Sequence, residues 1–150
     1  QVDKEGNINV SKFGTKIPGF GGFINISQNS KKVVFMGTFT AGGLEVKIDD
    51  GKLTIVKEGK ARKFVNNLEQ RTFNGKLAAK KNANVLYVTE RCVFKLTVDG
   101  LELIEVAPGI DIERDIIPNM DFRPIIKNPR PMDERIFKNQ PMGLQVEAFE

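Results

Sequence analysis

Histidine and tryptophan are absent from this 150-residue sequence, and cysteine occurs once, at Cys92. Without histidine the chain holds no Ser-His-Asp triad. A lone cysteine cannot supply the four ligands of a Cys/His zinc site, so we expect no metal site. One cysteine also forms no intrachain disulfide. An unpaired thiol is typical of reducing compartments, which predicts a cytoplasmic location.

Long hydrophobic runs are also absent, since no apolar stretch approaches the roughly 18 residues of a membrane span. The first residues, Gln-Val-Asp-Lys-Glu, do not have the pattern of a signal peptide. We therefore expect no membrane partner. Because residue 1 is not Met, we also expect a processed chain or a fragment.

Positive charge is in modest excess, with 23 Lys and Arg against 19 Asp and Glu. Residues 1–75 carry 12 basic and 7 acidic residues, whereas residues 76–150 carry 11 and 12. Nucleic-acid binders usually cluster Lys and Arg on one element, so we expect no nucleic-acid partner. A mildly positive first half fits an anionic ligand, such as a phosphate-bearing cofactor.

Seven short apolar or alternating runs predict β-strands, at residues 6–10, 33–37, 44–48, 53–56, 85–89, 92–96 and 101–106. The run 33–37 is continuously apolar, which is typical of a strand covered on both faces. Asp50-Gly51 between two alternating runs predicts a β-hairpin. We expect a further extended segment over residues 64–73, with a helix as the alternative.

Helices are expected at few places, namely residues 23–30, 75–81, 112–120 and 132–137. Asp111 is a suitable N-cap for the third of these helices, and Pro118 should shorten or end it. Three prolines predict a loop over residues 123–132, and the last residues predict a loose tail. Together these elements predict a mixed, sheet-dominated α/β domain with few helices and no internal domain boundary.

The segment Gly19-Phe20-Gly21-Gly22 is the strongest local signal for a site. A glycine backbone approaches a ligand closely, and its N–H groups can donate hydrogen bonds to an oxygen that gains negative charge during a reaction. A helix that begins at Phe23 would add partial positive charge. The alternative is a tight turn without a ligand, because Gly-X-Gly-Gly is common. The segment matches neither the dinucleotide fingerprint nor a Walker loop.

Two further polar segments follow apolar runs. Residues 38–43 lie after the run 33–37, where open α/β sheets bind ligands, although a polar turn is the alternative. Glu90 and Arg91 interrupt an apolar run, and we interpret them as a buried ion pair rather than as site residues. Cys92 is interpreted as a small buried hydrophobe. From its chemistry alone, the sequence predicts a ligand-binding α/β domain with no evident nucleophile.

Residues 18–43 resemble the C-terminal part of the family I coenzyme A transferases, closest to the propionate/acetate (short-chain acyl) branch. Later segments resemble the same family in the same order, at residues 87–94, 100–111, 120–126 and 132–137. The resemblance implies a fold of the NagB/RpiA/CoA transferase-like type. It also implies that residues 1–150 are the C-terminal, β-subunit-like portion of the catalytic domain, a fragment that lacks the N-terminal half.

The activity that the resemblance implies is that of an acyl-CoA:carboxylate CoA-transferase. In this family a glutamate attacks the thioester carbonyl and gives a mixed anhydride. Coenzyme A then forms a glutamyl thioester, and an incoming carboxylate reverses the sequence. Coenzyme A is therefore expected as a substrate and covalent intermediate, with no permanently bound cofactor. The expected partners are acyl-CoA, short-chain carboxylates, the missing N-terminal part and further copies in a homo-oligomer.

The resemblance also assigns site residues. The backbone N–H groups of Gly21 and Gly22 would form an oxyanion hole. Coenzyme A or substrate would be bound by Gly19, Phe20, Thr38 and Thr40. The family's nucleophile lies in a Glu-Ser/Asn-Gly motif upstream of the glycine segment, and this chain contains no such motif. We therefore expect the isolated chain to show no turnover. Asn25 stands where many relatives carry Asp, which puts a charge-dependent role there in doubt.

Three alternatives stay open. An acyl-CoA hydrolase of the same superfamily would use water in place of the carboxylate. A non-catalytic module would bind an anionic ligand or a protein partner. Nucleic-acid binding depends only on the positive first half, and it would show a steep dependence on salt.

Overall fold

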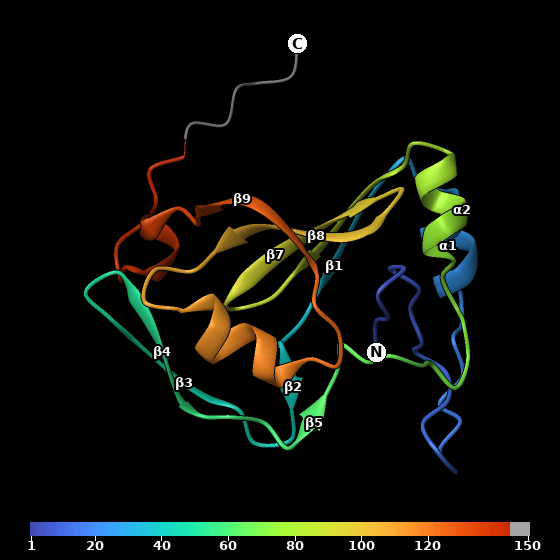
Figure 1. Cartoon of the computed structure of the whole chain (residues 1–150), viewed down its shortest axis with the longest axis horizontal. Coiled ribbons are helices and arrows are strands. Elements are labelled where there is room, and N and C mark those ends of the chain that lie inside the picture. Colours follow the sequence, from blue (N-terminus) through green and yellow to red (C-terminus); the bar gives the residue numbers. More distant parts are fainter. Residues whose placement is uncertain (145–150) are drawn as a thin grey trace.

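The computed structural model describes residues 1–144, which form one five-stranded sheet, two two-stranded sheets and short helices (Figure 1). The strands are β1 (Lys32–Met36), β2 (Thr40–Ala41), β3 (Glu45–Asp49), β4 (Lys52–Lys57), β5 (Ala61–Arg62), β6 (Asn84–Val88), β7 (Cys92–Thr97), β8 (Gly100–Val106) and β9 (Ile125–Pro131). The helices are α1 (Phe23–Asn29), α2 (Gly75–Lys80), η1 (Ile112–Ile116), η2 (Ile117–Asn119) and η3 (Glu134–Phe137). The predicted mixed, sheet-dominated α/β domain with few helices is confirmed.

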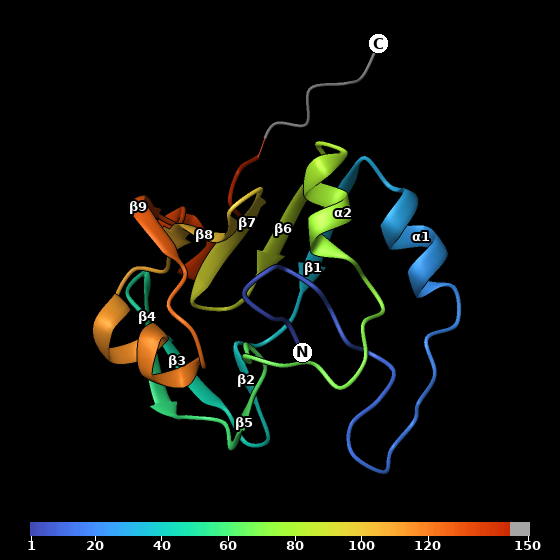
Figure 2. The ribbon, with the colours of Figure 1, turned by 45° about the vertical axis from the view of Figure 1, so that its right-hand side comes forward.

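The five-stranded sheet has the order β1-β6-β7-β8-β9. Its two outer pairs, β1 with β6 and β8 with β9, are parallel, whereas the inner pairs are antiparallel. In the first pair Val33 lies opposite Val85, and Met36 lies opposite Val88. The arrowheads of β1 and β6 therefore point to the same edge of the sheet (Figure 2).

An aromatic core covers one face of this sheet. The ring of Phe35 on β1 lies 5.0 Å from that of Phe73 and 5.8 Å from that of Phe23, the first residue of α1. Aromatic pairs at such distances contribute about 0.5–1.5 kcal/mol beyond their buried area. The two α-helices lie together on this side (Figure 2), where Asn74 N donates a hydrogen bond to Gln28 Oε1 at 2.8 Å. This packing brings the start of α1 near the end of β1.

A second, smaller core lies on the other face, beneath the hairpin of β3 and β4. Its buried residues are Leu53, Val93, Ala107, Met132 and Phe137. The hairpin predicted from Asp50-Gly51 is confirmed, since Asp49 pairs with Lys52 across the two residues. Both turn residues have positive φ, 47° at Asp50 and 73° at Gly51.

The N-terminal segment differs from its prediction as a strand over residues 6–10. Only isolated bridges form there, from Val2 to Ile8 and to Phe64, and from Ile8 to Phe73. The prediction was wrong because the polar residues of the alternation are buried too. Asn7 is 0% exposed, and its amide donates to Asp3 at 2.9 Å. Of the predicted extended segment 64–73, only the two end residues, Phe64 and Phe73, are paired by these bridges.

The prediction that the strand over 33–37 is covered on both faces was also wrong. Val33 and Phe35 pack against the aromatic core. Their neighbours on the opposite face are exposed, with 54% of Val34 and 78% of Met36 accessible. Within residues 1–144, this face of β1 is therefore left largely uncovered.

The C-terminal third contains one strand where a loop was expected. Residues 123–132 hold three prolines, yet β9 pairs with β8 and places Arg130 opposite Glu105. Proline lacks the N–H of a sheet ladder and is tolerated on outer strands such as this one. The prolines therefore mark the edge of the sheet rather than the absence of a strand.

The predicted helix over residues 112–120 is present as two different turns. The Asp111 side chain accepts from Arg114 N at 2.8 Å, which confirms the predicted N-cap. A π-helical turn, η1, then passes into the 3-10 turn η2 at Pro118, which has no N–H to continue an α-helix. The last predicted helix, 132–137, is the shorter 3-10 turn η3. The predicted tail lies mostly outside the described residues.

Candidate functional site

The parallel strands β1 and β6 end side by side, and two loops continue from them. The N–H of Gly37 donates to Val88 O at 3.1 Å, which extends the ladder by one residue. Residues 37–41 then leave β1, and residues 89–91 leave β6. The segment 38–43 thus lies where it was predicted, beyond the carboxyl end of a strand of the sheet.

The loop after β1 is fixed by hydrogen bonds from its neighbours. The Phe39 N–H donates to Glu90 Oε2 at 2.7 Å, and the Thr38 hydroxyl donates to Thr40 O at 2.7 Å. Thr40 is 1% exposed. Its hydroxyl donates to Glu58 and accepts from Gly59 N. Thr40 therefore holds the loop from inside, and of the two threonines only Thr38 presents its side chain at the surface.

Beneath this loop lies Arg91, which is 0% exposed. Its guanidinium donates to Glu90 Oε1 at 2.6 Å and to both oxygens of Glu58, at 2.7 and 3.0 Å. A fourth bond, at 2.8 Å, goes to the carbonyl of Asp115, and the group lies 4.8 Å from the ring centre of Phe39. The predicted ion pair of Glu90 and Arg91 is confirmed, and Glu58 joins it.

The electrostatics of this cluster follow from burial and pairing. Burial alone would lower the pKa of Arg91, but the hydrogen bonds to Glu58 and Glu90 outweigh it and raise the pKa. Burial would raise the pKa of Glu58, and the bonds from Arg91 and Thr40 outweigh that effect and lower it. Arg91 and Glu58 are therefore charged near neutral pH, and they fix the loop rather than exchange protons.

Cys92 follows the cluster and has no reactive character. Its side chain is 0% exposed, as predicted for a small buried hydrophobe. Burial raises the pKa of its thiol to about 12. A thiol that is protonated and shielded at neutral pH is not a nucleophile.

The glycine segment forms an exposed turn that leads into α1. Gly21 has a φ of 48°, a conformation that favours glycine. The Phe23 N–H donates to Phe20 O at 2.9 Å, which closes the turn. Within residues 1–144 no acceptor takes the N–H groups of Gly21 and Gly22. These two donors are thus unpaired within the described residues, and their role in an oxyanion hole stays a prediction.

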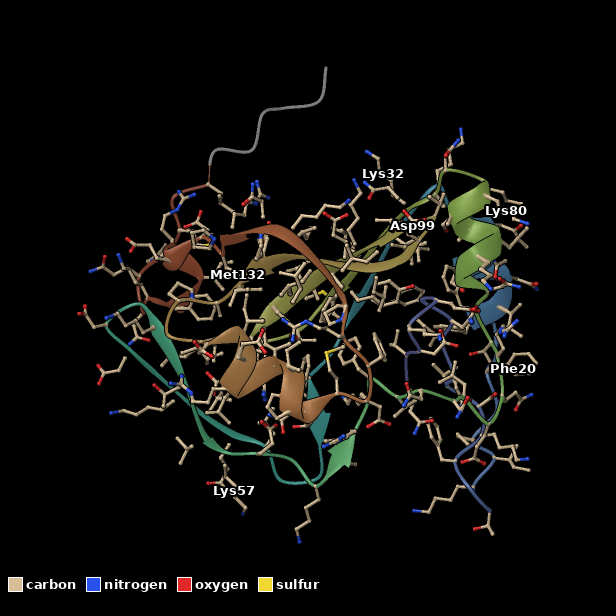
Figure 3. The ribbon with its side chains drawn as sticks, in the orientation of Figure 1. Phe20, Lys32, Lys57, Lys80, Asp99 and Met132 are labelled. Carbon is tan, nitrogen blue, oxygen red and sulfur yellow. The ribbon has the colours of Figure 1, made fainter. Side chains whose placement is uncertain are left out.

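The glycine segment directly precedes α1, which connects it to β1. Helix α1 runs back along β1, so that its first residue, Phe23, stacks near Phe35. A pocket of about 430 Å³ lies here, and both Phe23 and Thr38 line it. The four residues 19–22 do not line this pocket, and the Phe20 side chain is 45% exposed at the outer margin of the molecule (Figure 3).

Two residues of this region have no signal in the sequence. Glu58 and Lys63 lie in a polar stretch that resembles an ordinary loop. The pairing of β2 with β5 brings both to the end of β1, and these strands have only two residues each. Such short strands leave no periodic pattern, so only the structure identifies the two side chains.

Metal ligands and membrane-spanning helices are not found in the described part of the chain. Residues 1–144 contain no group of three or more His, Cys, Asp or Glu side chains that could hold an ion. None of the helices there has the length and the apolar character required to cross a bilayer.

Comparison with known proteins gives relatives at high identity. The chain is 52% identical over 144 residues to acetate CoA-transferase YdiF of Escherichia coli K12, and 51% identical over 152 residues to caffeate CoA-transferase of Acetobacterium woodii. These matches cover 95% and 97% of this chain. The chain is homologous to part of the coenzyme A-transferases. It spans 27–29% of the length of these relatives.

Solved structures agree with the sequence relatives. The crystal structure of acyl-CoA transferase YdiF from Escherichia coli O157:H7 matches 97% of this chain, with a TM-score of 0.94 and 51% identity. Glutaconate coenzyme A-transferase of Acidaminococcus fermentans shares the fold alone, with a TM-score of 0.63 at 19% identity. No protein-family model matches the chain. The CoA-transferase-like fold expected from the resemblance is thus confirmed.

Proposed function

We propose that residues 1–150 are the C-terminal, β-subunit-like portion of an acyl-CoA:carboxylate CoA-transferase that acts on short-chain acids. The observation that carries this proposal is the 51% identity and TM-score of 0.94 with the acyl-CoA transferase from Escherichia coli O157:H7. That protein has also been solved as a thioester complex with coenzyme A. Coenzyme A is accordingly the proposed substrate, and no resident cofactor is invoked.

In the proposed reaction, a glutamate outside residues 1–150 attacks the thioester carbonyl, and the carbonyl oxygen becomes negatively charged. The N–H groups of Gly21 and Gly22 donate hydrogen bonds to this oxygen. Donors fixed in advance stabilise such charge without reorganisation, and the loss of one costs about 10²–10³ in kcat. Collapse of the adduct expels the coenzyme A thiolate and leaves a mixed anhydride.

The thiolate then attacks the glutamyl carbonyl of the anhydride, which releases the first carboxylate and leaves a glutamyl–coenzyme A thioester. A second carboxylate reverses both steps, so that coenzyme A passes from one acid to the other. Gly19 and Phe20 are proposed to contact coenzyme A beside the oxyanion hole, and Thr38 the substrate. The buried Thr40 supports Thr38 through the loop.

Asn25 lies on the exposed side of α1, and its carbonyl accepts from Asn29 Nδ2 at 2.8 Å. Its side chain is neutral, so no charge-dependent step is assigned to it. The cytoplasmic location and the homo-oligomer stay predictions of this proposal.

The test is an exchange assay with the polypeptide as its gene encodes it. Incubation with acetyl-coenzyme A and propionate should give propionyl-coenzyme A and acetate with ping-pong kinetics. Release of free coenzyme A without any added acid would indicate the hydrolase instead. If neither propionyl-coenzyme A nor free coenzyme A forms, both the transferase and the hydrolase are contradicted. The isolated 150-residue chain should be inactive, and turnover by it would contradict a nucleophile outside these residues.

A further inference from the structure

The pocket at the end of β1 has one polar end. There Lys63 Nζ donates a hydrogen bond to Thr38 Oγ1 at 2.9 Å. The hydroxyl hydrogen of Thr38 is directed to Thr40 O at 2.7 Å, so its oxygen is the acceptor. An ammonium group carries three donors, and this bond uses one of them.

No carboxylate among residues 1–144 lies within ion-pair distance of Lys63 Nζ. The two glutamates of the neighbouring Arg91 cluster are engaged elsewhere. Both oxygens of Glu58 accept from Arg91, and those of Glu90 accept from Arg91 Nε and Phe39 N. Partial burial lowers the pKa of Lys63, and the charge of Glu90 offsets this only in part. The ammonium is therefore partly desolvated without a paired anion.

Gly37 lies beside the ammonium and lines the same pocket. A Cβ atom at this position would lie 3.5 Å from Lys63 Nζ, in van der Waals contact. The rest of the pocket is lined largely by hydrocarbon, including Phe13, Phe23 and Phe35. A site with one cationic end and an aromatic body matches a ligand with a small anionic head and a short apolar chain.

From this arrangement we propose that Lys63 binds the carboxylate of a short-chain monocarboxylic acid, whose hydrocarbon chain lies in the phenyl-lined pocket, while Thr38 positions the ammonium by accepting one of its hydrogen bonds. The identity of the ligand rests on the proposed function. A phosphate would bring a second negative charge close to the carboxylate of Glu90, which already interacts electrostatically with Lys63. The repulsion between these like charges favours a monoanion. Lys63 thus selects for acids, and the pocket limits their length.

Direct binding tests this site without any turnover. The probe is sodium butyrate, titrated into the polypeptide as its gene encodes it, and the readout is calorimetry or ligand-observed NMR. Butyramide serves as the neutral probe of the same size. The wild-type protein should bind butyrate at least about tenfold more tightly than butyramide, because charge-assisted hydrogen bonds contribute more than neutral ones.

The decisive variant is Lys63→Met, which should lose this preference and weaken butyrate binding about tenfold or more. Lys63→Arg should retain it, because the cation remains. Lys32→Met is the matched control, since Lys32 is an exposed lysine at the opposite end of β1 (Figure 3). As a second variant, Gly37→Val keeps Lys63 but fills the space beside it. This variant should also weaken the binding of butyrate.

Equal binding of butyrate and butyramide by the wild type would overturn the proposal, as would unchanged butyrate affinity in both Lys63→Met and Gly37→Val. The assay also separates this site from the proposed function. A protein that binds butyrate through Lys63 but transfers no coenzyme A contradicts the transferase alone. A transferase in which Lys63→Met leaves the KM for the acid unchanged contradicts this site alone.

Discussion

At the scale of single residues, the buried guanidinium of Arg91 determines which substitutions near the loop after β1 are possible without a loss of stability. Glu58 and Glu90 neutralise it, and both also hold the loop backbone or its side chains. Breaking a fully buried ion pair costs about 3–5 kcal/mol. Glu58 is partly exposed, and glutamine still accepts a hydrogen bond, so we expect Glu58→Gln to lower the free energy of unfolding by about 2 kcal/mol near pH 7.

This effect should depend on pH in a defined direction. The folded-state pKa of Glu58 lies below its ordinary value of 4.5. Its contribution is therefore complete above that value and is lost as the pH falls through the lower, folded-state pKa. Urea unfolding of wild type and Glu58→Gln should show a gap that narrows below about pH 4.5. A gap that stays constant or widens on acidification would contradict the pairing with Arg91.

A second residue-scale prediction concerns Cys92. Its thiol is buried, and burial raises its pKa to about 12. We expect no reaction with a thiol reagent at pH 8 in the native protein, and full reaction after unfolding in urea. Rapid native labelling, at a rate close to that of a free thiol, would show that β7 opens or that Cys92 is not buried.

At the scale of secondary-structure elements, the sequence predicts best where the signal is local. Asp50-Gly51 predicts the hairpin because two residues with positive φ form its turn. Strand β9 escapes prediction because its prolines indicate a loop, and only pairing with β8 fixes it. The candidate site divides in the same way. The glycine segment is a local signal, whereas Lys63 reaches Thr38 through the β2–β5 pairing of distant residues.

The hairpin turn offers a test at this scale. Gly51 has a φ of 73°, and a Cβ there would lie 3.2 Å from Lys138 Cε. A non-glycine residue in this left-handed conformation costs about 1–2 kcal/mol, so Gly51→Ala should lower the unfolding free energy by about that amount. Asp50→Asn is the control, because asparagine tolerates positive φ. Equal stabilities of the two variants would contradict the turn geometry.

At the scale of the whole molecule, one face of β1 exposes apolar side chains that a domain folding on its own would normally bury. Parallel strands are usually covered on both faces, yet Val34 and Met36 are 54% and 78% exposed. They lie opposite Leu86 and Val88 on the neighbouring strand, which are themselves only partly buried. Apolar residues that are contiguous in this way mark a contact surface.

The 150-residue chain alone should therefore self-associate as its concentration rises, which sedimentation velocity measures. Met36→Lys should reduce the association, because it places a charge in the middle of the exposed face. Val98→Lys is the control, since Val98 is 75% exposed but lies at the far turn between β7 and β8. A chain that remains monomeric at every concentration would contradict a contact role for this face.

The most direct test of the central claim removes a single N–H group from the glycine segment. Gly22 has a φ of −82°, which proline can adopt, and as the N-cap residue it directly precedes the first position of α1. Gly22→Pro thus deletes the donor, whereas Gly22→Ala keeps it and meets only the flexible end of Ile26. In the polypeptide as encoded, with folding checked by circular dichroism, we predict that Gly22→Pro lowers kcat for coenzyme A transfer about 10²–10³-fold while Gly22→Ala changes it little. Equal kcat values for the folded Gly22→Pro and Gly22→Ala proteins would contradict the oxyanion hole.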